Sequence, residues 1–383
     1  MDARYIRLLT SAATIVGKRY GLVPSELDRL IMRLTVLPRY DPRQSYDWNY
    51  THAPAAVPHD EPQVPGSWNF CGLPVSSPLG IAAGPLLNGE WILYYAALGF
   101  DVLTYKTVRS RHRDSYALPN LQPVESGRLV GGGPPLRARK EMRGSWAVSF
   151  GMPSKSPDVW RADIENTRRA LPKHKLLSVS VVATPEPHWT FEELADDFSR
   201  CARWALESGA DAVEANFSCP NVASADAQLY QQPEAAARIA ARLRAAVGST
   251  PLLLKIGHVT EEAQAAALAA AVSGHADALV MVNCISAQVA DDQQRPLFAG
   301  ERRGIAGEAI RVAALEQVRL FARVVGQQEL KLRIVGVGGI ATAAHVQAHL
   351  GAGGHAVQLA TAAMRDPRVG LAIRAALAET ACA

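Results

Sequence analysis

The chain has 383 residues, of which 48% are hydrophobic and 20% are charged, and its formal net charge is +4. This composition is typical of a globular protein and too weakly basic to indicate a nucleic-acid partner. The five cysteines form no C-x-x-C pair, which argues against a zinc site, an iron–sulfur cluster and a disulfide framework. We therefore expect no metal site. We also expect a cytoplasmic protein, because no clear signal peptide is present.

The N-terminal part differs in character from the rest of the chain. In residues 1–38, apolar side chains recur at helical spacing in two stretches that also carry arginine and lysine. One interpretation is a pair of packed helices, and the other is a basic amphipathic pair that lies on a membrane surface. Residues 39–72 are rich in proline and polar residues, so we expect a linker without regular structure there.

From residue 73 to residue 383, short apolar runs alternate with segments of helical spacing. The runs that we expect to be strands are residues 75–82, 102–106, 176–182, 212–217, 252–256, 278–283, 333–337 and 356–360. Strands that alternate with helices indicate a parallel sheet, and eight such units over about 300 residues predict a closed (β/α)8 TIM barrel. An open doubly wound sheet is the alternative. Residues 108–170 form a long insertion after the second strand, which is typical of a lid or binding loop.

Polar and small residues stand where these runs end, and barrel active sites lie at the carboxyl ends of strands. These strand-end residues are Ala82, Ala83, Gly84, Lys106, Thr107, Asn216, Ser218, Cys219, Asn221, Lys255, Asn283, Cys284, Gly338, Gly339, Ala360 and Thr361. Lys106 and Lys255 are the strongest signals, because burying a lone ammonium group is costly without an anionic or electron-rich partner. We therefore expect amides, two lysines and a thiol to meet at one rim.

This set suits flavin mononucleotide (FMN). Gly338 and Gly339 would let backbone N–H groups approach a phosphate, beside the positive end of the next helix. Thr361 would add another donor, and Lys255 would balance the negative charge of a reduced flavin ring. The small residues 82–84 would let a flat ring lie against the backbone.

The segment 336–341 also matches the dinucleotide pattern G-x-G-x-x-A. That pattern needs an acidic residue about 20 positions later to bind a ribose, and Gln358 stands there instead. We therefore favour a mononucleotide phosphate site.

Cys219 lies just beyond the fourth expected strand, between polar neighbours in NFSCPN. A thiol there can accept a proton if positive neighbours lower its pKa. Most cysteines are instead small buried hydrophobic residues, and we expect this for Cys71, Cys201 and Cys382. Cys219 is thus the candidate base.

Residues 73–375 resemble the dihydroorotate dehydrogenases, the flavin-containing barrels of pyrimidine synthesis. The matching segments are SPLGIAAG, NFSCPN, LLLKIG, MVNCIS, RGIAGEAI, IVGVGGIAT and AVQLATA. The resemblance implies that the protein oxidises dihydroorotate, or a related dihydropyrimidine or cyclic amide. Cys219 would remove a proton from C5, and a hydride would pass from C6 to flavin N5.

The same resemblance implies a role for individual residues. Lys106 would lie beside both the flavin and the substrate carboxylate. The implied substrate contacts are Asn216, Asn221, Asn283, Cys284 and Ser149. The implied cofactor contacts are Ala82, Ala83, Gly84, Lys106, Thr107, Lys255, Val282, Gly307, Gly338, Gly339, Ala360 and Thr361.

Three positions depart from the family pattern. The orotate-binding element Asn-x-Met-Gly-Phe/Leu-x-Asn reads VSFGMPS here, with Val148 and Ser154 in place of the asparagines. Leu87 stands where the membrane-bound class has a substrate lysine. A site that loses hydrogen-bonding groups should bind its substrate less tightly. Two alternatives therefore stay open: a flavin-dependent reductase of another unsaturated substrate, similar to dihydrouridine synthases, and a non-catalytic FMN-binding barrel.

The resemblance also bears on partners. The helical pattern of residues 1–38 resembles the quinone-channel domain of the membrane-bound class, whereas a cysteine base is the habit of the soluble class. We therefore expect a small-molecule substrate, a homodimer as in the soluble class, and membrane or quinone contact through residues 1–38.

Overall fold

The structure is a computed structural model that describes residues 37–125, 127–129, 131–218 and 225–380. The chain divides into two units, Met1–Arg39 and Tyr40–Ala383, and the features below belong to the second unit. The helical pair predicted for residues 1–38 lies outside the described residues except for its last two positions.

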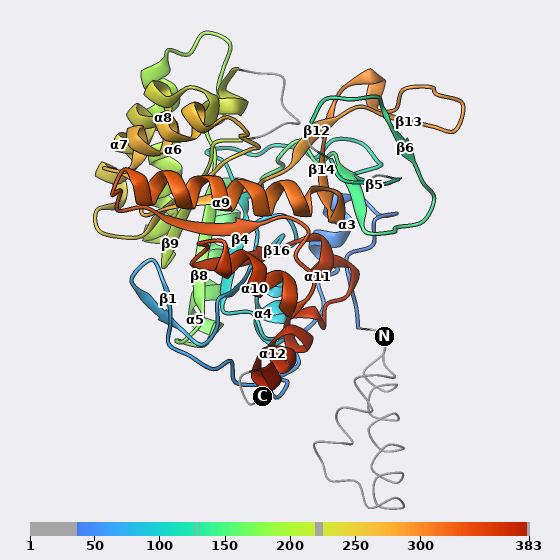
Figure 1. The fold of residues 1–383 in the computed structure, drawn as a ribbon, viewed down its shortest axis with the longest axis horizontal. Coiled ribbons are helices and arrows are strands. Elements are labelled where there is room, and N and C mark those ends of the chain that lie inside the picture. Colours follow the sequence, from blue (N-terminus) through green and yellow to red (C-terminus); the bar gives the residue numbers. More distant parts are fainter. Residues whose placement is uncertain (1–36, 126, 130, 219–224, 381–383) are drawn as a thin grey trace, which may run out of the picture. The chain divides into compact units, whose positions relative to one another are not determined.

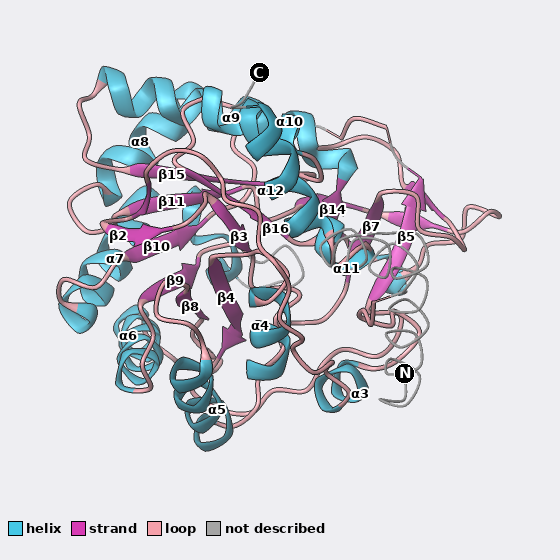
Figure 2. Ribbon diagram, turned by 90° about the horizontal axis from the view of Figure 1, so that it is seen from below, coloured by secondary structure: helices cyan, strands magenta, loops and turns pink. Residues whose placement is uncertain are grey.

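Eight parallel strands close into a barrel, as the alternation of strands and helices predicted (Figures 1 and 2). In order around the barrel they are β3 (Leu79–Ile81), β4 (Val102–Val108), β8 (Leu176–Val181), β9 (Ala212–Asn216), β10 (Leu252–Lys255), β11 (Ala278–Met281), β15 (Arg333–Val337) and β16 (Ala356–Leu359). Pairing of β16 with β3 closes the ring, which rules out the open sheet. Each strand overlaps one of the eight predicted runs.

Helices surround the barrel (Figure 2). They are α4 (Gly89–Ala96), α5 (Pro157–Ala170), α6 (Phe191–Glu207), α7 (Pro233–Val247), α8 (Glu262–Val272), α9 (Arg311–Gln327), α10 (Ala343–Gly351), α11 (Thr361–Arg365) and α12 (Val369–Thr380), with 3-10 turns η1 (Ala225–Gln231), η2 (Phe298–Gly300) and η3 (Glu308–Ile310). Helix α6 starts with a capping box in which Thr190 and Glu193 satisfy each other's backbone N–H groups. Among the described residues, no helix combines the length and apolar character needed to cross a membrane.

A second sheet of six strands stands outside the barrel. Its strands, in spatial order, are β12 (Ile285–Ala287), β14 (Arg303–Gly307), β7 (Ser145–Val148), β5 (Leu121–Glu125), β6 (Leu136–Ala138) and β13 (Val289–Ala290). Strands β5, β6 and β7 come from the predicted insertion 108–170, and β14 pairs antiparallel with β7. The end of that insertion is helix α5, an ordinary helix of the barrel. The insertion is thus shorter than predicted and is ordered by pairing with the segment after β11.

Residues 39–72 differ from the expected stretch without regular structure. They contain helix α3 (Tyr46–Thr51) and strand β1 (Trp68–Phe70), which forms a hairpin with β2 (Leu73–Val75). The Ser45 hydroxyl accepts a hydrogen bond from the Trp48 N–H and caps α3. These elements are too short for sequence periodicity to reveal them.

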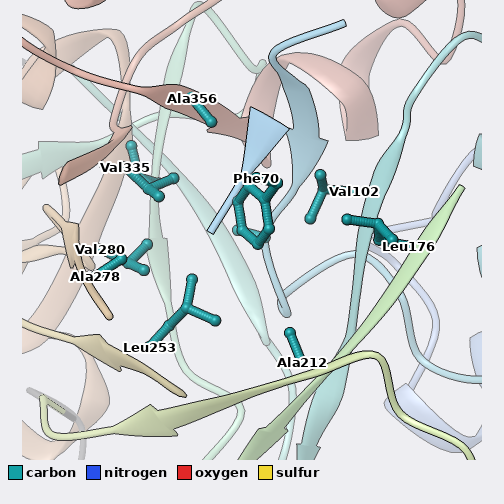
Figure 3. Packing of buried hydrophobic residues seen from close by; sticks show 11 residues of the cluster. Phe70, Val102, Leu176, Ala212, Leu253, Ala278, Val280, Val335 and Ala356 are labelled. Atoms are coloured by element: carbon teal, nitrogen blue, oxygen red, sulfur yellow. The ribbon is translucent and has the colours of Figure 1, made fainter. Parts of the chain in front are cut away.

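The hairpin closes the amino end of the barrel with Phe70. This side chain is 2% exposed and packs in a cluster with residues at the amino ends of the barrel strands, including Val102, Leu176 and Ala212 (Figure 3). Sequence analysis placed the first strand at residues 75–82, but it begins at Leu79 because Leu73–Val75 belongs to the hairpin. The amino end of the barrel is therefore a packed apolar core.

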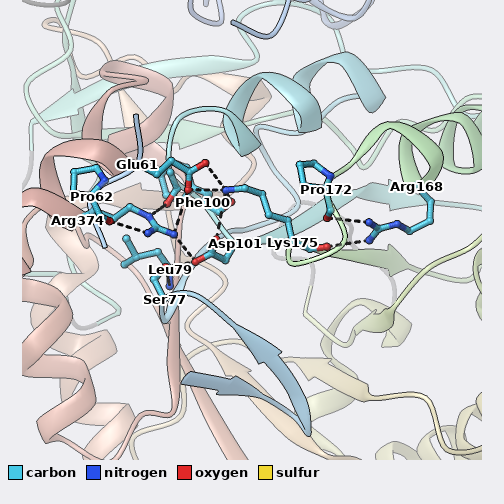
Figure 4. Close-up of polar contacts among 11 residues, drawn as sticks. Glu61, Pro62, Ser77, Leu79, Phe100, Asp101, Arg168, Pro172, Lys175 and Arg374 are labelled. Atoms are coloured by element: carbon cyan, nitrogen blue, oxygen red, sulfur yellow. Dashed lines mark hydrogen bonds and ion pairs between the residues drawn. The ribbon is translucent and has the colours of Figure 1, made fainter. Parts of the chain in front are cut away.

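Buried ion pairs hold two parts of the chain against the barrel (Figure 4). These parts are the C-terminal helix α12, which carries Arg374, and the segment before the first barrel strand, which carries Glu61. Arg374 Nη2 lies 2.7 Å from Asp101 Oδ2, and the two side chains are 1% and 0% exposed. Lys175 Nζ lies 2.8 Å from Glu61 Oε1 and 3.5 Å from Asp101 Oδ1. Arg374 also donates to the carbonyl oxygen of Gly99 over 2.8 Å. Each buried charge in the cluster therefore has a close partner of opposite sign, so removal of one partner would leave the other uncompensated.

We predict that Arg374→Met lowers the free energy of unfolding by about 3 kcal/mol, because it leaves Asp101 buried with one cation fewer. Urea unfolding of the purified variant measures this. Arg323→Met is the matched control, since Arg323 pairs with Glu262 at the surface with side chains 50% and 54% exposed. We expect a change below about 1 kcal/mol for the control. Equal losses in the two variants would contradict a structural role for the buried cluster.

Candidate active site

The inward side chains of the barrel strands become polar toward the carboxyl ends. Successive residues of a strand point to opposite faces, so every second residue enters the barrel. The inward series are Val102, Thr104 and Lys106 on β4; Ala212, Glu214 and Asn216 on β9; Leu253 and Lys255 on β10; and Ala356 and Gln358 on β16. The first member of each series belongs to the apolar cluster at the amino end. The polar members therefore lie toward the carboxyl end of the barrel.

A network of buried polar side chains crosses the barrel there. Lys255 is 4% exposed, and its ammonium group donates to Gln358 Oε1 over 3.2 Å. Gln358 Nε2 donates to Thr104 Oγ1 over 3.1 Å and to Glu214 Oε2 over 3.3 Å. Lys255 Nζ and Glu214 Oε1 are 4.0 Å apart. Burial lowers the pKa of Lys255, and the nearby Glu214 carboxylate opposes that shift.

A cavity opens next to this network, beyond the ends of β15 and β16. It is lined by six predicted site residues: Asn283, Gly307, Gly338, Gly339, Ala360 and Thr361. Gln358 also lines it, together with the basic residues His345 and Arg365. Burial lowers the pKa of His345, and the positive charge of Arg311 lowers it further. Arg365 gives the cleft a positive charge that suits an anionic group, and the neutral His345 ring can donate an N–H, while the Glu308 carboxylate also lines the cleft.

The glycines of this cavity are required by close backbone contacts. Gly307, Gly338 and Gly339 have φ angles of 100°, 127° and 67°, which side chains rarely allow. A Cβ atom on Gly339 would lie 2.5 Å from Arg311 Cβ and 2.8 Å from the Gly307 carbonyl oxygen. A Cβ atom on Gly307 would lie 2.1 Å from the carbonyl oxygen of Gly144. The loop after β15, the end of β14 and the start of β7 therefore form one cradle.

Asn216 and Asn283 converge on the peptide groups of Ser218. Asn216 Oδ1 accepts from the Ser218 N–H over 3.1 Å, and Asn283 Nδ2 donates to the Ser218 carbonyl oxygen. Asn216 Nδ2 also contacts Met152 Sδ at 3.5 Å. Ser218 is itself 2% exposed. The two amides thus fix the start of the loop that continues into Cys219 and Asn221, which lie outside the described residues.

The ends of β3 and β4 complete the rim. Lys106 is 7% exposed, and its backbone N–H donates to the Leu86 carbonyl oxygen over 2.8 Å. An irregularity in the pairing of β4 with β8 accompanies the contact of the Thr107 hydroxyl with the Ser180 hydroxyl at 3.0 Å. Ala82 is bonded to β16 through its N–H, which donates to the Leu359 carbonyl oxygen over 3.0 Å.

The positions next to these rim residues have the following surroundings. Ala83 is half-buried, and a Cβ atom on Gly84 would meet no atom within 4 Å. Val282 is fully buried, while Cys284 is half-buried and close enough to Lys255 to help keep it protonated.

In residues 148–154, which replace the orotate-binding element, the serine hydroxyls form hydrogen bonds with other groups of the protein. Ser149 Oγ accepts from Arg303 Nε over 2.9 Å. Ser154 Oγ accepts from the Arg109 N–H over 3.1 Å and donates to the Lys155 carbonyl oxygen over 2.9 Å. Val148 is half-buried, and Leu87 is 1% exposed. Contact of Ser149 with a substrate stays a prediction.

Sequence reasoning missed Gln358 and Glu214 as site residues. Gln358 was noted only as a residue that cannot replace a ribose-binding acid. Both are polar residues at inward positions of apolar strands, which is the same signal that identified Lys255. Gly144 and Arg365, which line the cavity, carry no comparable signal in the sequence.

Comparisons with known proteins show the family of the chain. The sequence model of the family described as dihydroorotate dehydrogenase matches residues 67–380. A dihydroorotate dehydrogenase of Dictyostelium discoideum is 29% identical over 357 residues, which span 87% of this chain and 96% of that protein. The catalytic subunit of a dihydroorotate dehydrogenase B (NAD(+)) from Desulforudis audaxviator is 29% identical over 311 residues, or 80% of this chain and 90% of that protein.

A solved structure shares the fold. The crystal structure of DHODH in complex with ferulenol from Eimeria tenella superposes with a TM-score of 0.68 at 19% identity. The match covers 93% of this chain and 92% of that chain. Because the family match spans most of the sequence, including every barrel strand, this chain belongs to the dihydroorotate dehydrogenase family.

Proposed function

We propose that this protein is an FMN-dependent enzyme that oxidises dihydroorotate, or a closely related dihydropyrimidine, at its CH–CH bond. Its family is one of flavin-dependent oxidoreductases that act on such bonds. The position of Gln358 carries the proposal for this chain. Gln358 lines the glycine-rich cavity and also accepts the hydrogen bond of the buried Lys255. A phosphate-sized cradle and a cation suited to a flavin ring are thereby adjacent.

The residues of the cavity fit the phosphate end of FMN. Gly307, Gly338 and Gly339 would bring backbone groups close to the phosphate, since their conformations leave no room for side chains. Thr361 would add a hydroxyl, and the Arg365 guanidinium would favour a negative charge. This glycine cradle, which side chains at Gly307 and Gly339 would fill, is therefore the part of the chain that agrees best with FMN.

The interior residues fit the ring end. Bound FMN supplies a hydride acceptor at N5 and gathers negative charge on its N1–O2 side when reduced. Lys255 would hold that side of the ring, and Ala82, Ala83 and Gly84 would lie against its face. Lys106 and Thr107, at the end of the neighbouring strand, would complete the wall. The small size of residues 82–84 leaves space for a flat ring.

Cys219 is the proposed base. It follows directly on Ser218, whose peptide groups Asn216 and Asn283 hold at the rim. A thiolate at that place would take the proton from C5 of the substrate, while Lys106 would attract the substrate carboxylate. Asn221, Cys284 and Ser149 would bind the remaining polar groups of the substrate ring.

A different ring compound is the second candidate substrate. The Ser154 hydroxyl is hydrogen-bonded to backbone groups, and the side chains of Val148 and Leu87 cannot form hydrogen bonds. The site therefore has fewer side chains that can form hydrogen bonds with orotate than the family pattern provides. A dihydropyrimidine or cyclic amide with a less polar substituent suits this side of the site.

The sequence pattern of residues 1–38 supports a membrane or quinone contact as the route of electron removal. A homodimer is carried over from the soluble class of the family. The relative from Desulforudis audaxviator is named as acting with NAD(+), so a nicotinamide acceptor is the alternative for this chain.

We predict that the purified protein contains FMN and that dihydroorotate bleaches the flavin absorbance under anaerobic conditions. A panel of other dihydropyrimidines and cyclic amides, tested in parallel, identifies the preferred ring. Reoxidation by a soluble quinone or by NAD+ then identifies the acceptor. A protein that neither contains nor binds FMN would refute the proposal, and so would bound flavin that no ring compound reduces.

We predict that Cys219→Ala slows flavin reduction by at least about 100-fold while FMN stays bound, because the variant lacks the group that accepts the proton. Stopped-flow absorbance measures the rate. Cys71→Ala is the control, since burial raises the pKa of this thiol to about 12 and the residue packs against the apolar cluster at the amino end. Reduction of the Cys219 variant at the wild-type rate would exclude it as the base.

We predict that Gly339→Ala weakens FMN binding by about 30-fold or more, since a positive φ and two close contacts oppose the new methyl group. Fluorescence titration of the apoprotein measures the affinity. Gly351→Ala at the end of α10 is the matched control, because a Cβ atom there meets nothing within 4 Å. Unchanged affinity in Gly339→Ala would place the phosphate elsewhere.

A further inference from the structure

Glu214 is a buried carboxylate for which the proposed reaction has no use. It is 1% exposed and faces the barrel interior from β9, one inward position before Asn216. Burying a carboxylate is costly unless it is hydrogen-bonded or paired with a cation. Its hydrogen-bond donor in the described part of the chain is Gln358, at 3.3 Å, and its cation is Lys255, at 4.0 Å.

Gln358 fixes the positions of the Lys255 and Glu214 side chains relative to each other, because its amide is hydrogen-bonded to both. Its Oε1 atom accepts from Lys255, and its Nε2 atom donates to Glu214 and Thr104. A flipped amide would direct N–H groups at the ammonium and an oxygen at the carboxylate, so one orientation is favoured. The amide therefore keeps the ammonium and carboxylate near each other without direct contact.

Two titratable groups face Lys255 from the elements beside β10. They are Glu214 on β9 and Cys284, which follows β11, and both favour the protonated lysine. The neutral Gln358 faces it from β16, and Thr104 on β4 faces Gln358 in turn. Burial acts in the opposite direction and is the larger influence on the pKa of Lys255. Of the two groups, Glu214 opposes burial more strongly, and its carboxylate oxygen lies 4.0 Å from the ammonium group.

We propose that Glu214 is a positioning residue which, with Gln358, keeps Lys255 protonated beside the flavin ring and so sets the positive charge that the ring meets. This inference rests on the proposed function, because the ring beside Lys255 is that of the proposed FMN. A carboxylate about 4 Å away raises the pKa of an ammonium group by about 1 to 3 pH units. Without Glu214, burial would drive Lys255 toward its neutral form.

The test uses full-length protein with FMN bound and the substitution Glu214→Gln. The absorbance spectrum of the oxidised flavin is followed from about pH 6 to about pH 10, because loss of the lysine proton changes the field at the ring. We expect the transition of the variant about 2 pH units below that of the wild type. Below its transition, we expect a higher flavin midpoint potential than in wild type, since one negative charge has been removed.

Lys255→Met shows whether the effect passes through the lysine. We expect no transition in Lys255→Met, and none when Glu214→Gln is added to it. Glu262→Gln is the matched control, because this carboxylate pairs with Arg323 at the surface of α8. It should leave the transition at the wild-type pH. A Glu214→Gln transition at the wild-type pH, or an equal shift in the Lys255→Met background, would overturn the inference.

Gln358→Leu is a second, independent variant in case Glu214→Gln does not fold. It removes the acceptor of the ammonium group and keeps Glu214, so we expect a downward shift of about 1 pH unit. An unshifted transition in Gln358→Leu would also overturn the inference. These results differ from a failure of the proposed function, in which even the wild-type protein would not bind FMN.

Discussion

The buried ammonium group of Lys255 is the constraint on which the carboxyl end of the barrel depends. An ammonium that is 4% exposed loses most of its hydration, so the protein must supply other partners. Gln358 supplies an oxygen and Glu214 a compensating charge. Thr104 is the second acceptor for the Gln358 NH2 group, which also donates to Glu214. One lysine in an apolar strand thus dictates polar residues on three other strands.

The second constraint is the contact between the barrel and the outer sheet. Gly339, Gly307 and Gly144 lie so close together that a side chain on either of the first two would strike the backbone of the next. They belong to the loop after β15, the end of β14 and the residue before β7. The outer sheet is therefore part of the cavity wall, and β14 is fixed by pairing with β7 as well as by this contact. An independently moving lid does not fit such packing.

The barrel and much of its rim could be predicted because both follow from periodicity. Eight apolar runs separated by helical segments fit a closed barrel better than an open sheet, and a lysine inside LLLKIG stands out against its neighbours. Glu214 and Gln358 carry the same signal as Lys255, a polar residue inside an apolar strand, but their contacts with Lys255 and with each other follow only from closure of the barrel. The outer sheet has strands of only two to five residues, and its pairings of β14 with β7 and of β13 with β6 join positions about 150 residues apart, which leaves no local pattern. The roles of Cys219 and Asn221 still rest on the family motif.

The two ends of the barrel use buried charge in opposite ways. At the amino end, Arg374 and Lys175 lie 2.7 Å and 2.8 Å from carboxylate oxygens, so their N–H groups form ion pairs within the protein. At the carboxyl end, Lys255 is 4.0 Å from Glu214 and is held by a neutral amide instead. A direct ion pair would fix the lysine equally well, but it would use one of its N–H groups and place a full negative charge in contact with the ammonium. Gln358 accepts the hydrogen bond of Lys255 without a charge of its own, and the Glu214 carboxylate stands 4.0 Å away. This arrangement favours the protonated lysine and lets its positive charge act on a ligand.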